Sequence, residues 1–517
     1  MALHETLLSW PALAGAFVLY VLALYTYRLT LHPLAKFPGS KLAAISLWYE
    51  FYWDGYHRGQ YIFRIKEMHE KYGPIVRITP DELHINDPDF IPELMPVGGR
   101  RRDKYRRVMQ LFGFTEAAIS TVEHDVHRIR RGAMSRMFSK DSVRRLEPIM
   151  QANLEKLFAR MEEFKSSGQP LNLFPFFSAF TNDLIAEYAF GLSYNWLEAP
   201  EFNKSFFEMI TSFHEVGALA VQFNWVMPLI NSLPLSILKK LSPGMTEFVQ
   251  FKSDLMAKIN RVCARHQEGM DDKTVFDEIL DSNLSDFEKR PERLMEDAQN
   301  IAIAGTETTA WTLSVITFHL LRNPAILQKV KEELRNAIPD PDVPQSIKMI
   351  EQLPYLTAVI TEGLRLSMGT SNRQERVCPD EVLVFTDGDK TWNIPKGTPV
   401  GMTTPLIHLN PAIFPAPLTF DPERFLANPK LKRYLMSFSQ GSRQCLGMNL
   451  AYAELYLVLS GLWRRFGGPE SKEGEGVSGG RLELFETDET DVEMVYDLFV
   501  PYAKKESLGI RVRVLGS

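Results

Sequence analysis

The segment Phe438–Gly447, FSQGSRQCLG, constrains the fold more than any other part of the chain. It runs directly into an apolar stretch with helical character, MNLAYAELYLVLSGLW. A lone cysteine at the start of a helix meets unpaired backbone N–H groups and the positive end of the helix dipole, which both stabilise its thiolate. Gly441 and Gly447 permit unusual dihedrals and let the backbone approach a bound group closely. The segment therefore predicts that Cys445 is a thiolate metal ligand.

The other cysteines do not compete for this role. The chain has only three cysteines, Cys263, Cys378 and Cys445, and no two of them form a CxxC pair. This usage argues against a disulfide framework or a structural zinc site and fits a reducing compartment. Cys263 and Cys378 lack the glycine-rich context and are expected to be inert. The alternative for Cys445 is a buried structural cysteine.

A second chemical signal is the segment Ala304–Thr309, AGTETT, within a helix expected from Pro291. A glycine inside a helix costs roughly 1 kcal/mol relative to alanine, so Gly305 indicates a need for space or a local distortion. Ala304 and Thr308 are four residues apart and share one helical face. Taken alone, the segment favours the alternative of a threonine-rich buried helix with a surface glutamate.

The first of these segments resembles the cysteine-ligand loop of the cytochrome P-450 family, FxxGxRxCxG, at every fixed position. The resemblance implies that Cys445 binds the iron of haem b, iron protoporphyrin IX. It also implies that Arg443 pairs with a haem propionate, that Phe438 packs on the ring near the sulfur, and that Gly441 and Gly447 lie close to the macrocycle.

The second segment is similar to AGx(D/E)T(T/S), which lies on the distal side of the haem in the same family. Ala304 and Gly305 are then expected beside the haem. The resemblance implies that Glu307 and Thr308 are the acid and the alcohol that organise proton delivery to dioxygen.

Two weaker patterns also resemble segments of the family, and their charged residues are expected to pair with one another. Glu362-Gly363-Leu364-Arg365 matches ExxR, with its two charges three apart on one helical face. The later segment FDPERF, which contains Arg424, matches the PERF-type segment of the family. Glu362, Arg365 and Arg424 are therefore expected to form a buried structural network behind the cysteine loop.

The remaining haem contacts implied by the resemblance are cationic. Where the family usually shows WxxxR, this chain has His127 and Arg131, four residues apart and able to reach a propionate together. An ordinary solvated histidine is the alternative for His127. Arg376 occupies the other propionate-binding position, and Arg373 is the second choice there.

The N-terminal run Thr6–Tyr27 contains no charged residue. As a helix rising about 1.5 Å per residue it spans roughly 33 Å, enough for the core of a bilayer. A cleaved signal peptide is the alternative, but the run is long for one and no Lys or Arg precedes it. Because Arg28, Lys36 and Lys41 follow the run, the larger part of the chain is expected in the cytosol.

The rest of the chain indicates one helix-rich domain. Its 517 residues, 45% of them hydrophobic, can bury a large core. We expect a mainly α cytochrome P-450 fold with a small β region, divided into a membrane anchor (1–30), a Pro-rich hinge (31–41) and a haem-thiolate catalytic domain (42–517). The helices are expected at 56–72, 116–138, 142–165, 176–192, 244–268, 291–322, 324–337, 350–368 and 446–465. The Gly-rich stretch 467–480 is expected to be a surface excursion.

The function implied by the resemblance is a membrane-bound monooxygenase of fungal secondary metabolism. Electrons would come from NADPH through a cytochrome P-450 reductase that carries FMN and FAD. The substrate is expected to be small and hydrophobic, with a terpenoid favoured over a polyketide or an alkaloid, and the location is the endoplasmic reticulum membrane. The 58 Lys and Arg residues against 64 Asp and Glu give no footprint for nucleic acid.

Several finer expectations follow. The segments expected to select the substrate are Arg101–Thr121, 205–230, Thr370–Asn372, Leu498–Val500 and the helical face of Ile301. The apolar segment Val221–Ile237 is expected either at the membrane or in the core. The basic residues expected on the proximal side are Arg128, Arg130, Arg136, Lys432 and Arg433. The alternatives to a monooxygenase are a haem-thiolate isomerase or dehydratase that needs no reductase and a haem-binding protein without turnover.

Overall fold

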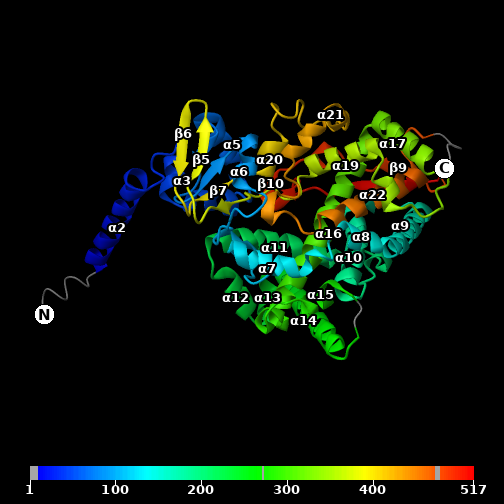
Figure 1. The fold of residues 1–517 in the computed structure, drawn as a ribbon, viewed down its shortest axis with the longest axis horizontal. Coiled ribbons are helices and arrows are strands. Elements are labelled where there is room, and N and C mark those ends of the chain that lie inside the picture. The colour runs from blue at the N-terminus through cyan, green and yellow to red at the C-terminus, as the bar shows by residue number, and fades with distance from the viewer. Residues whose placement is uncertain (1–9, 271–272, 472–477, 517) are drawn as a thin grey trace.

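The computed structural model describes residues 10–270, 273–471 and 478–516. Helices make up most of the body. One small sheet and a hairpin lie on the side from which α2 projects, and a second small sheet lies toward the opposite end, near the C-terminus (Figure 1). The expected mainly α fold with a small β region is confirmed. The main core is continuous across the helices, and a smaller apolar cluster fills the sheet region around Ile85 and Val400.

The helices of the large helical layer are α7 (His124–Ser135), α8 (Lys140–Arg145), α9 (Glu147–Ser167), α10 (Leu173–Phe190), α11 (Lys204–Gln222), α12 (Val226–Ser232), α13 (Leu235–Leu241), α14 (Pro243–Gln267), α15 (Val275–Asp281), α16 (Pro291–Arg322), α17 (Pro324–Ala337), α18 (Ile347–Ile350), α19 (Pro354–Ser367) and α22 (Met448–Arg465). Those nearer the N-terminus or the sheets are α2 (Trp10–Thr30), α3 (Lys41–Ile45), α4 (Trp48–Phe51), α5 (Tyr61–Tyr72), α6 (Ile91–Leu94), α20 (Thr404–His408) and α21 (Glu423–Ala427).

The described strands form two four-stranded sheets and two hairpins. One sheet has the order β1 (Ile75–Arg77), β2 (Leu83–Ile85), β7 (Pro399–Gly401), β4 (Arg376–Val377). The other has the order β3 (Leu171–Asn172), β12 (Arg511–Leu515), β9 (Gly480–Leu484), β8 (Phe466–Gly467). The hairpins are β5 (Leu383–Asp387) with β6 (Lys390–Ile394), and β10 (Tyr496–Leu498) with β11 (Val500–Tyr502). Residues 472–477 of the Gly-rich stretch lie outside the described residues.

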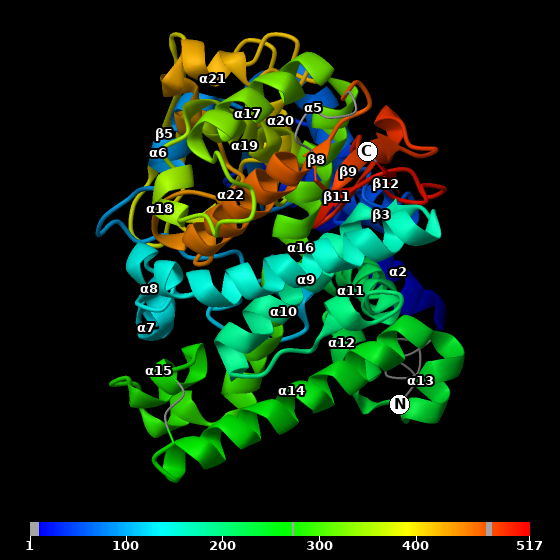
Figure 2. The same ribbon diagram turned by 90° about the vertical axis from the view of Figure 1, so that its right-hand side faces the viewer.

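Helix α16 runs through the middle of the body, with α10 and α14 packed on one side and α19 and α22 on the other (Figure 2). Pro291 begins it, since proline fits the first helical position, where no N–H is needed. Gly305 lets α10 pack closely, because an added Cβ would meet Cγ1 of Ile185 at 2.8 Å. The missing side chain of Gly305 therefore serves helix packing, which differs from the sequence-based interpretation that it leaves room for a reactant.

Five helix expectations differ from the structure. The helix expected at 142–165 is divided at Leu146 into α8 and α9. The helix expected at 116–138 begins only at His124, because residues 116–123 form turns whose backbone N–H groups are bound by carboxylates of α16. The helix expected from 56 begins at Tyr61 after a short π-helix. The expected 176–192 helix begins at Leu173, capped by Asn172. The expected 350–368 helix is split, because Pro354 starts α19. Helix α11 was not predicted.

The N-terminal helix α2 projects from the body (Figure 1), and none of its residues is buried. It is long and apolar enough to cross a membrane, as the sequence predicts for most of the same residues. The segment after α11 lies beside α4, since the Phe223 ring is 5.8 Å from that of Trp48. One face of this segment exposes Trp225 and Leu229, and the other face packs Met227 into the main core.

Candidate active site

A cavity of about 330 Å³ lies between α16 and the loop that precedes α22. Cys445, Leu446 and Gly447 line one side, and Ile301, Ala304, Thr308 and Thr312 of α16 line the other. The fold therefore brings together the two segments that carried the strongest chemical signals in the sequence, although more than 130 residues separate them. A volume of this size is within the range of small-molecule sites, roughly 300–1,000 Å³.

The cysteine loop is held by its own backbone. The Cys445 N–H donates to the Phe438 carbonyl at 2.8 Å, and Phe438 lines the cavity beside the cysteine. Gly441 has φ +71°, and an added Cβ would meet the Met95 carbonyl oxygen at 2.5 Å. Gly441 does not line the cavity, and its positive φ and close approach to Met95 show that it serves close packing of the loop. Nothing lies within 4 Å of a Cβ at Gly447, which leaves open space at the cavity wall.

Three influences act on the pKa of the Cys445 thiol, which is exposed to the cavity but lies deep in the protein. Desolvation is the largest influence and raises the pKa, whereas the Gly447 N–H and the Arg131 guanidinium lower it. The position at the start of a helix thus does not cancel the rise in the pKa of the Cys445 thiol that desolvation causes. A bound metal cation would cancel it, because a thiol that coordinates a metal is deprotonated. Cys263 and Cys378 are also free thiols, and neither lines this cavity.

The opposite wall of the cavity is the face of α16 that carries Ala304 and Thr308, which the sequence analysis placed on one helical face. Thr308 donates its hydroxyl to the Ala304 carbonyl at 3.1 Å, a common bond for a threonine inside a helix. Glu307 follows the same turn and also lines the cavity. Burial raises the pKa of the Glu307 carboxyl to about 8, so it is mostly protonated at neutral pH. A protonated acid beside a hydroxyl can deliver a proton into the cavity.

Three arginines that the sequence selected lie along the edge of the cavity. Arg443 donates to the carbonyls of Thr121 and Val122 at 2.7 Å, and its Nε has no hydrogen-bond partner among the described residues. Arg131 donates to the Gln444 carbonyl at 2.7 Å, and Arg376 donates to the Ser439 hydroxyl at 3.0 Å. All three line the cavity.

Lys104 and His127 join this cationic edge. Lys104 donates to the Ile119 carbonyl, and burial with Arg443 and Arg376 nearby holds the pKa of its ammonium well below the usual range. His127 is buried at the cavity wall, where burial and the neighbouring cations lower its pKa to about 2. The imidazole is therefore neutral there. The sequence analysis missed Lys104, which sits in the basic run RRDKYRR.

Among the described residues, the cations of this edge are not paired with carboxylates, although Glu375 lies near Lys104 and Arg376 and partly offsets the fall in pKa that burial causes in both. In the described ranges, Lys104, Arg131, Arg376 and Arg443 form no ion pair with a carboxylate. Arg373, by contrast, is surrounded by acids and contacts Glu50 at 2.6 Å. The edge therefore suits a ligand with anionic groups, and Arg376 is better placed for it than Arg373.

The three charged residues predicted to form a structural network, Glu362, Arg365 and Arg424, contact one another away from the cavity. Arg365 Nε and Nη2 donate to the two carboxylate oxygens of Glu362, both at 2.7 Å, and Arg424 Nε donates to the same carboxylate at 3.1 Å. Arg365 also donates to the carbonyls of His408 and Pro417. Glu362 and Arg365 are fully buried, and neither lines the cavity.

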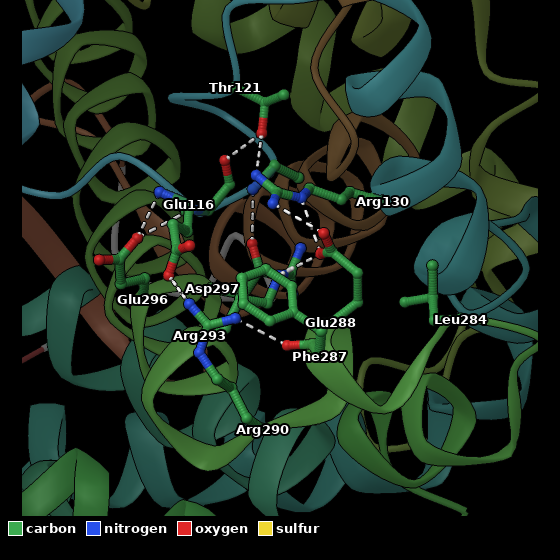
Figure 3. Close-up of polar contacts among 12 residues, drawn as sticks. Glu116, Thr121, Arg130, Leu284, Phe287, Glu288, Arg290, Arg293, Glu296 and Asp297 are labelled. Atoms are coloured by element: carbon green, nitrogen blue, oxygen red, sulfur yellow. Dashed lines mark hydrogen bonds and ion pairs between the residues drawn. The ribbon is translucent and has the colours of Figure 1, made fainter.

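A separate polar network fixes the loop above the cavity (Figure 3). The Glu296 carboxylate accepts the backbone N–H groups of Glu116 and Ala117, and the Asp297 carboxylate accepts that of Ala118 at 2.8 Å. Arg130 binds Glu288 at 2.8 Å and is buried. The expectation that Arg130 belongs to an exposed basic face is therefore wrong, whereas Arg128, Arg136, Lys432 and Arg433 are exposed.

Each segment that the sequence analysis expected to select the substrate contributes to the cavity wall. The contributing residues include Met109, Phe112, Phe114, Phe213, Ile301, Thr370, Asn372, Phe499 and Val500. The wall is mainly apolar and aromatic. His214 of α11 is a polar exception that the sequence analysis did not single out, because a histidine in an apolar helix carries no signal of its own.

Glu454 is a second buried acid near the cavity, on α22. Burial raises its pKa to about 8, against roughly 4.3 in an unfolded chain. The folded protein thus keeps a proton that the unfolded chain releases, so this group lowers stability as the pH rises from about 4 to about 8. Glu454→Gln is expected to reduce that loss, measured as urea midpoints across this pH range, and the exposed Glu70→Gln is the control. Equal pH dependence in Glu454→Gln and wild type would contradict the assignment.

Comparison with known proteins agrees with this arrangement. The family model described as Cytochrome P-450 matches residues 44–473. Cytochrome P-450 monooxygenase tpcC of Cochliobolus heterostrophus is 45% identical over 96% of this chain and 95% of its own length. Cytochrome P-450 monooxygenase astB of Talaromyces wortmannii is 40% identical over 96% of both chains. Tryptophan 6-hydroxylase fscE of Fusarium equiseti is 38% identical over 96% of this chain and 95% of its own length.

The chain belongs to the cytochrome P-450 family, whose members are haem-thiolate enzymes. It is an oxidoreductase of the monooxygenase type, which incorporates oxygen from dioxygen into a substrate.

Proposed function

We propose that this enzyme inserts one oxygen atom of dioxygen into a small hydrophobic secondary metabolite, with electrons supplied from NADPH by a flavin-containing reductase. The observation that carries the proposal is the cavity with Cys445 on one wall and the Ala304–Thr308 stripe on the other. Its apolar lining favours a hydrophobic substrate, and a terpenoid remains our first choice. The printed name of fscE, a tryptophan hydroxylase, adds an aromatic amino acid to the classes worth testing.

The residues of the cavity fit a haem. The cationic edge without carboxylate partners suits two propionates, with Arg131, Arg376, Arg443 and Lys104 as their donors and His127 as a neutral hydrogen-bond donor. Cys445 would be the thiolate ligand, and Phe438 would pack beside the sulfur. The haem would supply the iron at which dioxygen is activated, with electron density donated by the thiolate.

Glu307 and Thr308, on the side of the cavity opposite Cys445, would deliver protons to the reacting oxygen. Glu307 carries a proton at neutral pH because burial raises its pKa to about 8. The Thr308 hydroxyl, one residue along α16, can accept that proton while donating its own toward the reacting oxygen. Ala304 leaves space on the same face. Apolar side chains such as Phe213 and Phe499 would exclude water and hold the substrate against this face.

The reductase would dock behind the cysteine loop. A groove on that side is lined by Lys140, Arg144, Lys432 and Arg433 together with Gln444 of the loop. Positive side chains around a groove can steer an acidic partner and raise its association rate. Of the basic residues expected from the sequence, Lys432 and Arg433 line the groove, whereas Arg130 pairs with Glu288.

The membrane arrangement is part of the proposal. Residues 1–30 would form a single-pass anchor in the endoplasmic reticulum membrane, 31–41 a hinge, and 42–517 a cytosolic catalytic domain. The apolar α2 supports the anchor. Trp225 and Leu229 are exposed, and Phe223 close to them in the chain packs on Trp48 of α4, which supports a second contact with lipid.

The alternative functions differ from a monooxygenase in whether they need Glu307 and Thr308 of α16. A haem-thiolate isomerase or dehydratase needs neither a reductase nor a proton-delivering pair, so the presence of Glu307 and Thr308 favours the monooxygenase. A haem-binding protein without turnover would show no product and no dependence on Thr308.

Thr308→Ala tests the proposal. Without the hydroxyl, proton delivery is less ordered, so a larger share of NADPH is expected to yield hydrogen peroxide instead of water or product. The measurement is NADPH consumption and peroxide release with purified reductase, followed by product analysis with terpenoid, polyketide and tryptophan panels. Ser314→Ala is the matched control, since Ser314 makes the same bond to a carbonyl of α16 at 2.8 Å but does not line the cavity. An unchanged peroxide share in Thr308→Ala would reject the role of Thr308.

A further inference from the structure

His214 occupies an unusual position between the acid of the active site and the C-terminal hairpin. It lies on α11, is 3% exposed, and lines both the active-site cavity and the smaller cavity at its mouth. Its neighbours on the cavity wall, such as Phe213 and Phe499, are aromatic. A buried imidazole in such surroundings needs partners for both ring nitrogens.

The two ring nitrogens face two different groups. Nδ1 lies 3.0 Å from the Tyr502 hydroxyl, at the end of β11, and Nε2 lies 3.8 Å from Oε2 of Glu307. Tyr502 is half-buried as a residue and also interacts with the Thr211 side chain, and burial raises the pKa of its hydroxyl well above the usual range. A polar path therefore leads from this phenol, which keeps its proton at rest, through the imidazole to the buried acid.

The gap at Glu307 is small enough to close. No described side chain forms a hydrogen bond with the Glu307 carboxyl, and a rotation that brings Oε2 about 0.6–0.9 Å closer to Nε2 would turn the 3.8 Å separation into a hydrogen bond. One bridging water would serve equally. No cation competes for the carboxylate, because burial alone accounts for its raised pKa.

The protonation states give the path a direction. Burial lowers the pKa of His214 to about 4 and raises that of Glu307 to about 8, so at neutral pH the imidazole is neutral and the acid protonated. With the ring proton on Nε2, the Tyr502 O–H donates to Nδ1 and the Nε2–H donates to Oε2. The acidic proton of Glu307 is then left to point toward Thr308. Every hydrogen bond in this arrangement runs inward.

We propose that Tyr502 and His214 form a proton relay that reprotonates Glu307 after each transfer to the reacting oxygen. When Glu307 gives up its proton, its carboxylate takes the proton of Nε2, and Nδ1 takes the proton of the Tyr502 hydroxyl. Tyr502 then regains a proton from solvent or from the Thr211 side. One proton enters and one leaves, so the relay returns to its starting charge. The transfer leaves the proton of the ring on Nδ1 and that of Glu307 on Oε2, so the imidazole must regain its Nε2–H tautomer and the carboxyl must turn back toward Thr308 before the next cycle. The proposal rests on the proposed roles of Glu307 and Thr308.

Few other charges face the relay. Arg58 and Glu215 pair with each other at 2.7 Å and lie near Tyr502, where they act on its phenol in opposite directions. Glu215 is 47% exposed, so the outer end of the path is close to solvent. For Glu307 and His214 burial is the only resolved influence on the pKa. His214 is thus a positioning residue that acts through Glu307.

Infrared spectroscopy of the haem-loaded enzyme tests the inner bond. The C=O stretch of protonated Glu307 is identified as the band that Glu307→Gln removes. A carbonyl oxygen that accepts a hydrogen bond absorbs at lower wavenumber, so His214→Phe is expected to move this band upward. Tyr502→Phe, which keeps the imidazole and the ring packing, is expected to move it less in the same direction. Tyr188→Phe is the control, because it loses a buried phenol bond to the Met137 carbonyl outside the cavity.

The second readout is NADPH oxidation with purified reductase and no added substrate, in H₂O and in D₂O. Both relay variants are expected to release a larger share of peroxide and to show a larger solvent isotope effect. The rate should fall by less than the roughly 10²-fold of a positioned proton donor, because water can partly replace a relay. Tyr188→Phe is expected to match the wild type.

The outcomes separate the relay from the function on which it rests. An unmoved infrared band in His214→Phe, or a wild-type peroxide share and isotope effect in Tyr502→Phe, overturns the relay. If Thr308→Ala raises the peroxide share while both relay variants do not, the relay fails and the proposed function stands. If Thr308→Ala also leaves the share unchanged, the proposed function itself fails.

Discussion

Replacing Cys445 with serine is expected to remove the thiolate signature of the enzyme and essentially all of its turnover. A serine hydroxyl has no accessible anionic form at neutral pH and donates far less electron density than a thiolate. The measurement is the carbon monoxide difference spectrum of the dithionite-reduced protein. The wild type should show the long-wavelength Soret band of a haem-thiolate complex, and Cys445→Ser should lack it.

The other two cysteines provide matched controls. Cys263 is partly buried and Cys378 is buried, and neither lines the cavity. Cys263→Ser and Cys378→Ser are therefore expected to keep the wild-type spectrum. A thiolate spectrum that survived in Cys445→Ser but disappeared in either control would move the ligand to another cysteine and refute the central assignment.

The sequence predicted the parts of the site that are local. The helix at 291–322 was predicted with its exact bounds because proline starts it and its apolar period is long. The cysteine loop was recognisable because its glycines and its cysteine are close together in the chain. Gly441 shows the limit of such a pattern. Its close approach is to the carbonyl of Met95, more than 340 residues away in sequence, and no local pattern contains that contact.

Lys104 and His214 show why other site residues could not be predicted. Lys104 lies in a run of basic residues that has the composition of a solvated surface, and only the packing of residues 116–123 against α16 brings it to the cavity. His214 acquires its partners from β11 and α16, which lie far from it in sequence. Arg130 shows the opposite error. It was expected among the basic residues of the proximal side, but it is buried because it pairs with Glu288. In each case a tertiary contact decided the outcome.

The largest loss of stability is expected from Glu362→Ala. The carboxylate of Glu362 is fully buried and accepts hydrogen bonds from Arg365 and Arg424. Its removal leaves the buried Arg365 guanidinium with carbonyl partners only. Breaking a buried ion pair by removing one partner costs about 3–5 kcal/mol. We expect a lower urea midpoint and a lower yield of haem-loaded protein.

The pair Arg64 and Glu67 offers a control for this prediction with the same spacing. The two side chains are three residues apart, as Glu362 and Arg365 are, and lie 2.6 Å from each other, but Glu67 is 57% exposed. Exposed pairs contribute about 0–1 kcal/mol, so Glu67→Ala should be nearly silent. The double variant Glu362→Leu, Arg365→Leu removes both buried charges and should recover part of the loss. Equal destabilisation by Glu362→Ala and Glu67→Ala would mean that burial does not set the strength of this network.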